Sequence, residues 1–460
     1  MKKIIVAIFS LTAVLLFTTC KKNFKASALT SGDADFTNYI AVGNSLTQGY
    51  QNGGVYEAGQ RNSYPSIIAH QMKLVQPGMN EFVQPYFPGN GSGYIHLEWK
   101  NNQLQVVNKH DPGGYREDPT FNNISYAGQQ LSNLGTSGIK LIGTCYDPTV
   151  PGDNYNTYLL AANNPYFKRM FNLGQPATPI NYLTNVVQSK PTFFTSWLGN
   201  NDILGYASGG GEPLAIAIMG TTFYVYGLSD PTEFRKKYDR ALDSLTKNGA
   251  KGIVATIPNV TSIPYFNLVN LQNIKGPDGA QLNVYIKTSN GVRAATNDDR
   301  ILLPAVAKMN KFVKDSLYDN GVAVKDSSGD VILVYCPQPY GLTPTNPIDG
   351  NEVLDSDEFA SIPPALAALN AQIKASAAAH HIPVVDMEDF LKNFESGFAL
   401  DGVNYSTKYI EGGVFSLDGV HPNGRGYAII ANKFIEGINS YYHSNIPLVN
   451  INNYKGIVFP

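Results

Sequence analysis

The feature that most constrains this sequence is a repeated order of amphipathic helix and apolar strand. A helix is predicted from Asp230, which has the residue type of an N-cap and is followed by Pro at the first helical position. Its apolar residues recur at helical spacing, and a strand-like run over 251–258 follows. The order recurs as an Ala-rich helix over 362–381 and a strand over 382–386. Such alternation predicts an α/β class with a mostly parallel sheet.

Other core elements and two insertions complete the expected domain, which spans residues 36–460. Strands are predicted over 36–42 and 191–198, and helices over 63–74 and 422–442. The stretches 75–122 and 264–347 break the alternation and are predicted as long insertions. The first of them is rich in Gly, Pro, Asn and aromatic residues and contains short alternating runs typical of hairpins.

Composition excludes some classes of partner. The chain has 460 residues, 43% of them hydrophobic, and a formal net charge of −2. This apolar share suffices for a packed core. The near-neutral charge gives no strongly basic face, so no nucleic-acid partner is expected. Oligomeric state is left open by the sequence.

The N-terminus resembles an export signal. Lys2 and Lys3 precede an apolar run from Ile4 to Phe17, which ends shortly before Cys20. The run is too short to span a bilayer as a helix, which takes about 20 residues. We expect a lipoprotein signal peptide over 1–20, lipidation of Cys20, a flexible tether over 21–35 and an extracytoplasmic, membrane-anchored protein. Secretion with an incidental cysteine, or a retained signal anchor, is the alternative.

Two further cysteines, Cys145 and Cys336, lie far apart in the chain. In an oxidising compartment they could form a disulfide. Buried thiols at both positions are an equal alternative.

Two distant segments together hold the parts of a nucleophilic site. Ser45 follows the first predicted strand, and Asp418 and His421 share one turn before the last helix. A serine hydroxyl needs a base to take its proton and a carboxylate to orient that base. Asn201 follows the strand 191–198 and could direct its amide at an oxyanion. Loops at the carboxyl ends of parallel strands meet at one edge of a sheet, so these side chains are expected to meet there.

These segments resemble the sequence blocks of the GDSL, or SGNH, hydrolases. Gly43-Asn44-Ser45-Leu46 is similar to the first block, Gly199-x-Asn201-Asp202 to the third and Asp418-x-x-His421-Pro422 to the fifth. Gly128 stands where the family has its second-block glycine. The four blocks follow in the family's order, and no Gly-x-Ser-x-Gly elbow of the α/β-hydrolase fold was found.

The resemblance implies a flavodoxin-like three-layer α/β/α sandwich and a division of roles. Ser45 is the expected nucleophile, His421 its general base and Asp418 the residue that orients the base. The expected oxyanion hole consists of the Ser45 N–H, the Gly128 N–H and the Asn201 side chain. No metal and no organic cofactor follow from the resemblance. Asn44 replaces the family's usual Asp, and an amide is expected to retain part of its local hydrogen bonding.

The predicted function is a secreted or lipid-anchored serine esterase or lipase that cleaves carboxylic esters through an acyl-serine intermediate. The apolar stretch 214–226 favours an acyl lipid as substrate, whereas the aromatic insertion 75–122 favours an acetylated glycan. A carbohydrate O-acetyl esterase is therefore an alternative. An acyltransferase using the same residues, or a non-catalytic glycan-binding surface lipoprotein, is a further one.

Overall fold

The computed structural model describes most of the predicted hydrolase domain. The described residues are 28–109, 126, 129–146, 150, 164–170, 182–211, 215–218, 221–224, 227–275, 279–312, 322–325, 331–334, 339–400 and 402–460. The predicted signal peptide with Cys20, together with Gly128 and Cys336, lies outside these residues.

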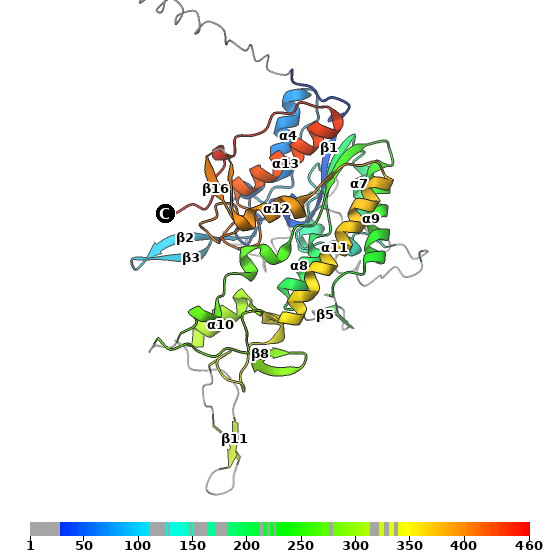
Figure 1. Ribbon diagram of the computed structural model, residues 1–460. Coiled ribbons are helices and arrows are strands. Elements are labelled where there is room, and N and C mark those ends of the chain that lie inside the picture. The colour runs from blue at the N-terminus through cyan, green and yellow to red at the C-terminus, as the bar shows by residue number, and fades with distance from the viewer. Residues whose placement is uncertain are drawn as a thin grey trace, which may run out of the picture.

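A four-stranded parallel sheet forms the centre of the molecule (Figure 1). Its order is β1 (Tyr39–Gly43), β4 (Phe193–Trp197), β7 (Lys251–Ala255) and β14 (Val384–Val385). A parallel bridge between Ala41 and Asn133 adds one more segment beyond β1. Numbered along the chain, the spatial order is therefore 2-1-3-4-5, which is that of flavodoxin-like sheets. The predicted α/β class with a parallel sheet is confirmed.

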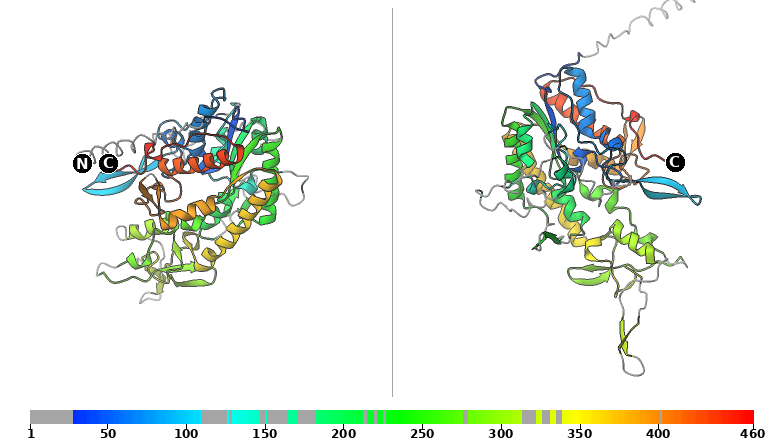
Figure 2. Two further views of the ribbon diagram at one scale, coloured as in Figure 1. Left: turned by 45° about the horizontal axis from the view of Figure 1, so that its top comes forward. Right: turned by 180° about the vertical axis from the view of Figure 1, so that it is seen from behind.

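Helices cover both faces of this sheet, which gives the three predicted layers (Figures 1 and 2). On one face α4 (Tyr64–Val75) packs against α13 (Gly424–Tyr442). On the other face α9 (Pro231–Thr246) packs against α7 (Tyr182–Gln188) and α11 (Ser356–Ala379). Both faces of the sheet are thus covered, and every residue of β1 and β4 is buried.

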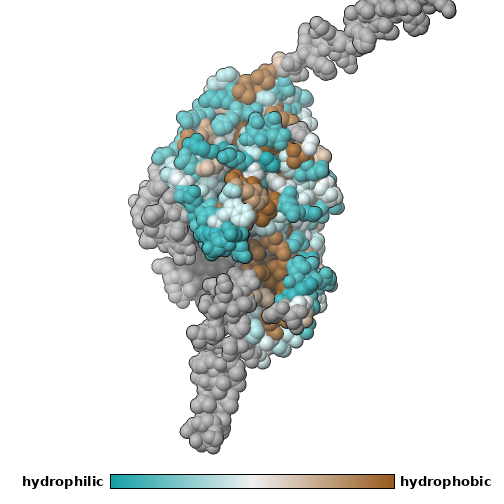
Figure 3. Space-filling model, turned by 90° about the vertical axis from the view of Figure 1, so that its left-hand side faces the viewer, coloured by the Kyte–Doolittle hydropathy of each residue, from teal (hydrophilic) through white to brown (hydrophobic). Residues whose placement is uncertain are grey.

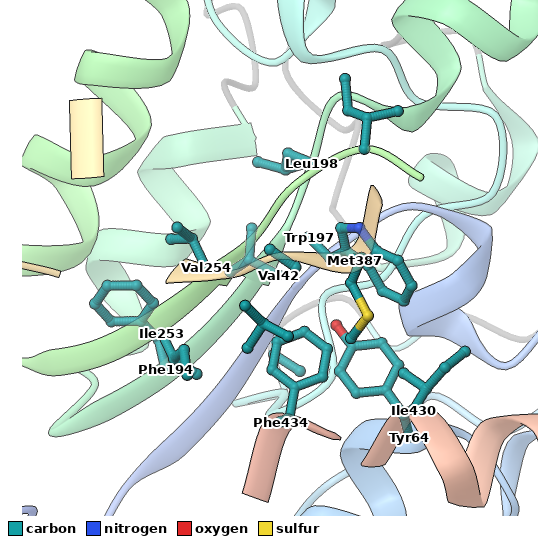
Figure 4. Packing of buried hydrophobic residues seen from close by; sticks show 14 of the residues in the cluster. Val42, Tyr64, Phe194, Trp197, Leu198, Ile253, Val254, Met387, Ile430 and Phe434 are labelled. Carbon is teal, nitrogen blue, oxygen red and sulfur yellow. The ribbon is translucent and has the colours of Figure 1, made fainter. Parts of the chain in front are cut away.

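Aromatic side chains tie the helix layer to the end of β4 (Figure 4). The rings of Tyr64 and Phe434 are stacked, with centroids 4.9 Å apart, and the edge of Trp197 packs against both. The Trp197 indole also donates a hydrogen bond to the carbonyl of Thr256. This packing fixes the carboxyl end of β4, from which the Gly199–Asp202 segment continues.

Capping side chains account for the starts of α9 and α11. Asp230 accepts hydrogen bonds from the N–H groups of Thr232 and Glu233, as predicted for α9. Helix α11 begins at Ser356, six residues before the predicted start. Asp355 and Glu358 form a reciprocal capping box there, and the helix continues through two internal prolines.

The prediction of a flexible tether over 21–35 is wrong for the last residues of that range. Asp33 N–H donates to the carbonyl of Tyr442 at 2.7 Å, and Asn445 N–H donates to the carbonyl of Thr30 at 2.8 Å. Ala34 is buried beside them. This segment is therefore held on the C-terminal end of α13, because backbone groups there lack partners within the helix.

The two insertions have structures of their own. In the first, β2 (Tyr94–Lys100) and β3 (Gln103–Lys109) form the predicted antiparallel hairpin. The second contains β8 (Tyr285–Thr288), β9 (Gly291–Ala294), β10 (Arg300–Ile301), α10 (Leu303–Phe312), β11 (Val322–Lys325) and β12 (Val331–Val334). It has a separate small core, which includes Ile348 and Val353 and thus reaches β13 (Val353–Leu354), beyond the predicted limit at 347.

Shorter elements complete the described chain. They are α3 (Glu57–Gln60), α6 (Pro165–Met170), β5 (Ala215–Ile218), β6 (Thr221–Tyr224), α12 (Met387–Ser396), β15 (Phe398–Leu400) and β16 (Val403–Tyr405). Within the described ranges, no helix is long and apolar enough to cross a membrane. The face seen in Figure 3 carries scattered hydrophobic patches among hydrophilic side chains rather than one continuous apolar surface.

Candidate active site

The first predicted site residue, Ser45, starts a short helix at the end of β1. Helix α2 (Ser45–Gln48) is capped by Asn44, whose side-chain oxygen accepts from Leu46 N–H at 3.1 Å. Gly43 allows the tight turn, because a Cβ at this position would lie 2.0 Å from the Thr47 hydroxyl. The N–H of Ser45 lies in the first helical turn, where such groups have no intrahelical acceptor. It is therefore suited to bind an oxyanion.

The Asp418–His421 turn is built around the aspartate itself. One carboxylate oxygen, Oδ1, accepts from the N–H groups of Val420 at 2.9 Å and His421 at 2.8 Å. Side-chain capping of this kind stabilises a tight turn. The turn leads into α13, whose N-cap is Asn423.

The structure brings Ser45, His421 and Asp418 into one hydrogen-bonded chain. His421 Nε2 lies 2.9 Å from Ser45 Oγ, and His421 Nδ1 lies 3.1 Å from Asp418 Oδ2. The side chains of His421 and Asp418 are 13% and 12% exposed. The nucleophile, base and orienter predicted from sequence are thus assembled from residues 376 positions apart.

Two opposing effects act on the pKa of Asp418. Burial raises this pKa. The side chain and N–H of His421 and the N–H of Gly53 together lower it by more, so the pKa of Asp418 is below its ordinary value. The carboxylate is therefore ionised at neutral pH and accepts from the imidazole. This fixes His421 in the tautomer whose Nε2 can take the Ser45 proton.

Asn201 lies in the first turn of α8 (Asn200–Ser208), which follows β4. The N-cap of α8 is Gly199, whose φ of +104° lies in the left-handed region. Asn201 Nδ2 donates to the carbonyl of Ile139 at 2.9 Å. Since a primary amide has two N–H bonds, this contact orients the side chain and leaves a second donor for a ligand.

Asp202 holds the neighbouring segment. Its buried carboxylate accepts from Leu141 N–H at 2.7 Å and from the Ser229 hydroxyl at 2.9 Å. Burial raises the pKa of Asp202, and Lys140 and the N–H donors partly oppose that effect. It holds the Leu141 and Ser229 segments against the start of α8 and does not join the Ser45–His421–Asp418 chain of hydrogen bonds.

The predicted oxyanion glycine, Gly128, lies outside the described residues. Another segment runs beside β1, where Leu134 N–H donates to Ala41 O and Thr136 N–H donates to Gly43 O. It continues into Gly138, with φ of +79°, directly before the Ile139 carbonyl that Asn201 contacts. Sequence reasoning missed this glycine, although Asn-Leu-Gly-Thr-Ser-Gly at 133–138 is a strong turn signal.

Sequence reasoning also missed the turn that supports the Asp–His segment. Asn52 Oδ1 accepts from Leu417 N–H at 2.9 Å, and Asn52 N–H donates to the Ser416 hydroxyl at 2.8 Å. Gly53 N–H donates to Asp418 Oδ2 at 2.9 Å. The Asn52-Gly53 dipeptide, a common turn signal, could have indicated this turn.

Comparison with known proteins relates one part of the chain to a family. Residues 307–434 match the family model described as GDSL-like Lipase/Acylhydrolase. The matched range includes Asp418 and His421 and begins after Ser45 and Asn201. This similarity supports a hydrolase of ester substrates.

Solved structures similar to this chain were also found. One is an alpha/beta hydrolase enzyme from the metagenome of Lake Arreo, Spain, which is 11% identical to this chain. The match covers 88% of this chain and 96% of that chain, with a TM-score of 0.36. Another is the lipase/acylhydrolase from Enterococcus faecalis, with 10% identity, 89% and 98% covered, and a TM-score of 0.32. No curated protein matches the chain. Because these similarities are low, the fold rests on the sheet order described above.

Two cavities adjoin the segments that carry Ser45, His421 and Asp418. A small cavity of about 60 Å³ has an almost entirely apolar lining that includes Leu46 and Val420, the sequence neighbours of Ser45 and His421. A larger one of about 370 Å³ is lined by Asn52, Leu417 and the hairpin residue Tyr94, among others. The ring of Tyr94 stacks on Tyr56 at 4.1 Å between centroids.

Proposed function

We propose that the protein is a serine esterase that cleaves carboxylic esters through an acyl-Ser45 intermediate. The observation that carries this proposal is the continuous chain from Ser45 Oγ through the His421 imidazole to the Asp418 carboxylate. Each link has the length of a hydrogen bond, and each group has the chemistry that its role requires.

The steps follow from this geometry. Ser45 Oγ attacks the ester carbonyl while His421 Nε2 takes the hydroxyl proton, and Asp418 stabilises the imidazolium that forms. His421 then gives the proton to the leaving alcohol, which leaves the acyl group on Ser45. In the second half a water attacks the acyl-enzyme, with His421 again as base, and releases the acid.

The negative charge that develops on the carbonyl oxygen needs donors. Two of the donors predicted from sequence lie in the described residues: the Ser45 N–H at the start of α2 and the Asn201 amide. We assign the third donor to the N–H of Gly138 instead of Gly128, because Gly138 precedes the carbonyl to which Asn201 is bound. Preorganised donors of this kind each supply a factor of about 10² to 10³ in rate.

The substrate class depends on which cavity holds the acyl or alcohol part. The apolar cavity next to Leu46 favours a short acyl chain. The cavity beside Tyr94 favours a sugar, whose ring can stack on an aromatic face, and supports the carbohydrate O-acetyl esterase alternative. Within the apolar stretch 214–226, residues 215–218 and 221–224 form the antiparallel pair β5–β6, and their side chains lie outside the described part of the structure.

A chain-length series of nitrophenyl esters tests the function and separates the substrates. We expect hydrolysis by the mature protein and none by Ser45→Ala above the uncatalysed rate. Activity limited to the acetate ester favours an acetylated glycan, whereas activity extending to butyrate and longer chains favours an acyl lipid. Equal hydrolysis by wild type and Ser45→Ala would contradict the proposal, and a well-folded inactive wild type would favour the glycan-binding alternative. Adding an alcohol acceptor and measuring the transferred ester distinguishes an acyltransferase.

We also propose that the chain is exported and anchored through lipidated Cys20. The supporting pattern is the two lysines, the short apolar run and the small residues before Cys20. In bacterial cells labelled with a radioactive fatty acid, the wild-type protein is expected to carry label and Cys20→Ala to carry none. Label in both proteins would contradict lipidation at this cysteine.

A further inference from the structure

One aromatic residue that the catalytic scheme does not use, Tyr50, contacts Ser45 and His421 and is linked to Asp418 through Gly53. Its backbone N–H donates to the carbonyl of Ser45 at 3.0 Å. Its ring lies against the imidazole of His421, with centroids 4.5 Å apart and an interplanar angle of 38°. Its hydroxyl donates to the carbonyl of Gly53 at 2.6 Å, and Gly53 N–H donates to Asp418 Oδ2.

The surroundings of Tyr50 hold its ring in this place. The buried Tyr427 hydroxyl donates to the Tyr50 carbonyl at 2.6 Å, which ties the residue to α13. The Tyr50 ring packs against a small buried cluster of Val55, Phe87 and Tyr166. Backbone, ring and hydroxyl of Tyr50 are thus all constrained, and the imidazole rests on a fixed surface.

We propose that Tyr50 is a positioning residue for His421, a role that rests on the proposed esterase function. Its first effect is geometric, because the ring restricts rotation of the imidazole out of the line between Ser45 and Asp418. Its second effect is electrostatic. When His421 takes the Ser45 proton it becomes a cation, and the face of an aromatic ring within about 6 Å attracts a cation. Both effects favour the transition state over the resting enzyme.

The ring and the hydroxyl of Tyr50 have separable roles. The ring contacts His421, while the hydroxyl donates to Gly53 in the turn that supports Asp418. The groups that face His421 are Asp418 and Ser45 from the two triad segments and Tyr50 from the segment after α2. Of these three groups only Tyr50 is aromatic. Removing its ring therefore removes the aromatic contact of His421 and leaves the hydrogen bonds of His421 in place.

The test compares Tyr50→Leu and Tyr50→Phe in steady-state hydrolysis of a nitrophenyl ester. Tyr50→Leu is expected to lower kcat about 3- to 30-fold, the range of a cation–aromatic contact, with KM nearly unchanged. Tyr50→Phe keeps the ring and is expected to restore kcat to within about threefold of wild type. Phe87→Leu is the matched control: it removes a ring from the same buried cluster, and kcat should change less than twofold.

Two results would overturn the inference: equal loss of kcat in Tyr50→Leu and Phe87→Leu, or no rescue by Tyr50→Phe. A second readout does not depend on catalysis. The Tyr50 ring current should displace the NMR signals of the His421 imidazole protons, assigned with His421→Gln, and Tyr50→Leu should move them. If wild type hydrolyses no ester and Ser45 is not acylated, the proposed function fails. The contact between Tyr50 and His421 is then tested by the imidazole NMR signals alone. If these signals are the same in wild type and Tyr50→Leu, the contact is refuted.

Discussion

The carboxylate of Asp418 has four hydrogen-bond donors around it, so its replacement by an amide gives a sharp prediction. Oδ1 accepts from the N–H groups of Val420 and His421, and Oδ2 accepts from Gly53 N–H and His421 Nδ1. An asparagine at this position has only one oxygen. If its NH2 group faces Val420 and His421, two backbone N–H donors lose their acceptor. If the NH2 group faces Gly53 and the imidazole, Gly53 N–H loses its acceptor, and His421 can pair with the amide only as the tautomer whose Nδ1 accepts.

The magnitude follows from these contacts. Leaving a buried donor without an acceptor costs about 1 to 3 kcal/mol. The better orientation of the amide leaves one such donor, so Asp418→Asn is expected to lower the free energy of unfolding by about 1 to 3 kcal/mol. The amide also favours the wrong tautomer of His421. In Ser-His-Asp sites, loss of the orienting carboxylate in this way lowers kcat by about 10⁴.

The assay combines nitrophenyl ester hydrolysis with denaturant unfolding of the same preparation. Asp243→Asn is the matched control, since it breaks another Asp–His pair, between Asp243 and His380 at 3.0 Å, in which the aspartate side chain is 71% exposed. We expect this control to retain activity within about twofold, as exposed pairs contribute little. A loss of less than tenfold in kcat for Asp418→Asn would refute the role assigned to Asp418.

Three further predictions follow from the site and its supports. The pKa of Asp418 is lowered from 3.8, so its ionised form stabilises the fold above that pH, and this contribution disappears as the pH falls through the lower folded-state pKa. The difference in unfolding free energy between wild type and Asp418→Asn, measured from pH 6 downward, should therefore shrink below about pH 4. A difference that stays constant would contradict the lowered pKa. Asn201→Ala should lower kcat by about 10² to 10³ at nearly unchanged KM, and a change in KM alone would indicate a binding role. Gly249→Ala is expected to destabilise the protein by about 1 kcal/mol, and Gly199→Ala by more. Both glycines have a positive φ, but only at Gly199 would a Cβ lie 2.9 Å from the Phe234 ring. Equal melting temperatures for the two variants would refute this.

Sequence alone predicted the elements whose local signals agree with their tertiary role. The continuous apolar run after Pro191 became the buried β4, and Asp230 capped α9 at the predicted position. The Asp418–His421 turn could be recognised because both side chains lie within one short segment, and Ser45 because it directly follows a buried strand.

The parts that sequence missed depend on contacts between distant segments. The tether was read as polar and small, but hydrogen bonds to Tyr442 and Asn445 hold its last residues. The segment ending at Gly138 pairs with β1 through a bridge and forms no long strand of its own, so periodicity gave no signal. The role of Tyr50 is visible only once His421, 371 positions further along the numbering, is packed on its ring.

The central claim is that Ser45 is an activated nucleophile, and labelling with a fluorophosphonate probe measures this most directly. The probe phosphonylates a serine hydroxyl whose proton is taken by a neighbouring base, and mass spectrometry of the digested protein locates the label. The account predicts one labelled peptide, containing Ser45, in wild type and none in Ser45→Ala, with His421→Gln labelled far more slowly. A folded wild type that stays unlabelled, or a label on another residue that persists in Ser45→Ala, would contradict it.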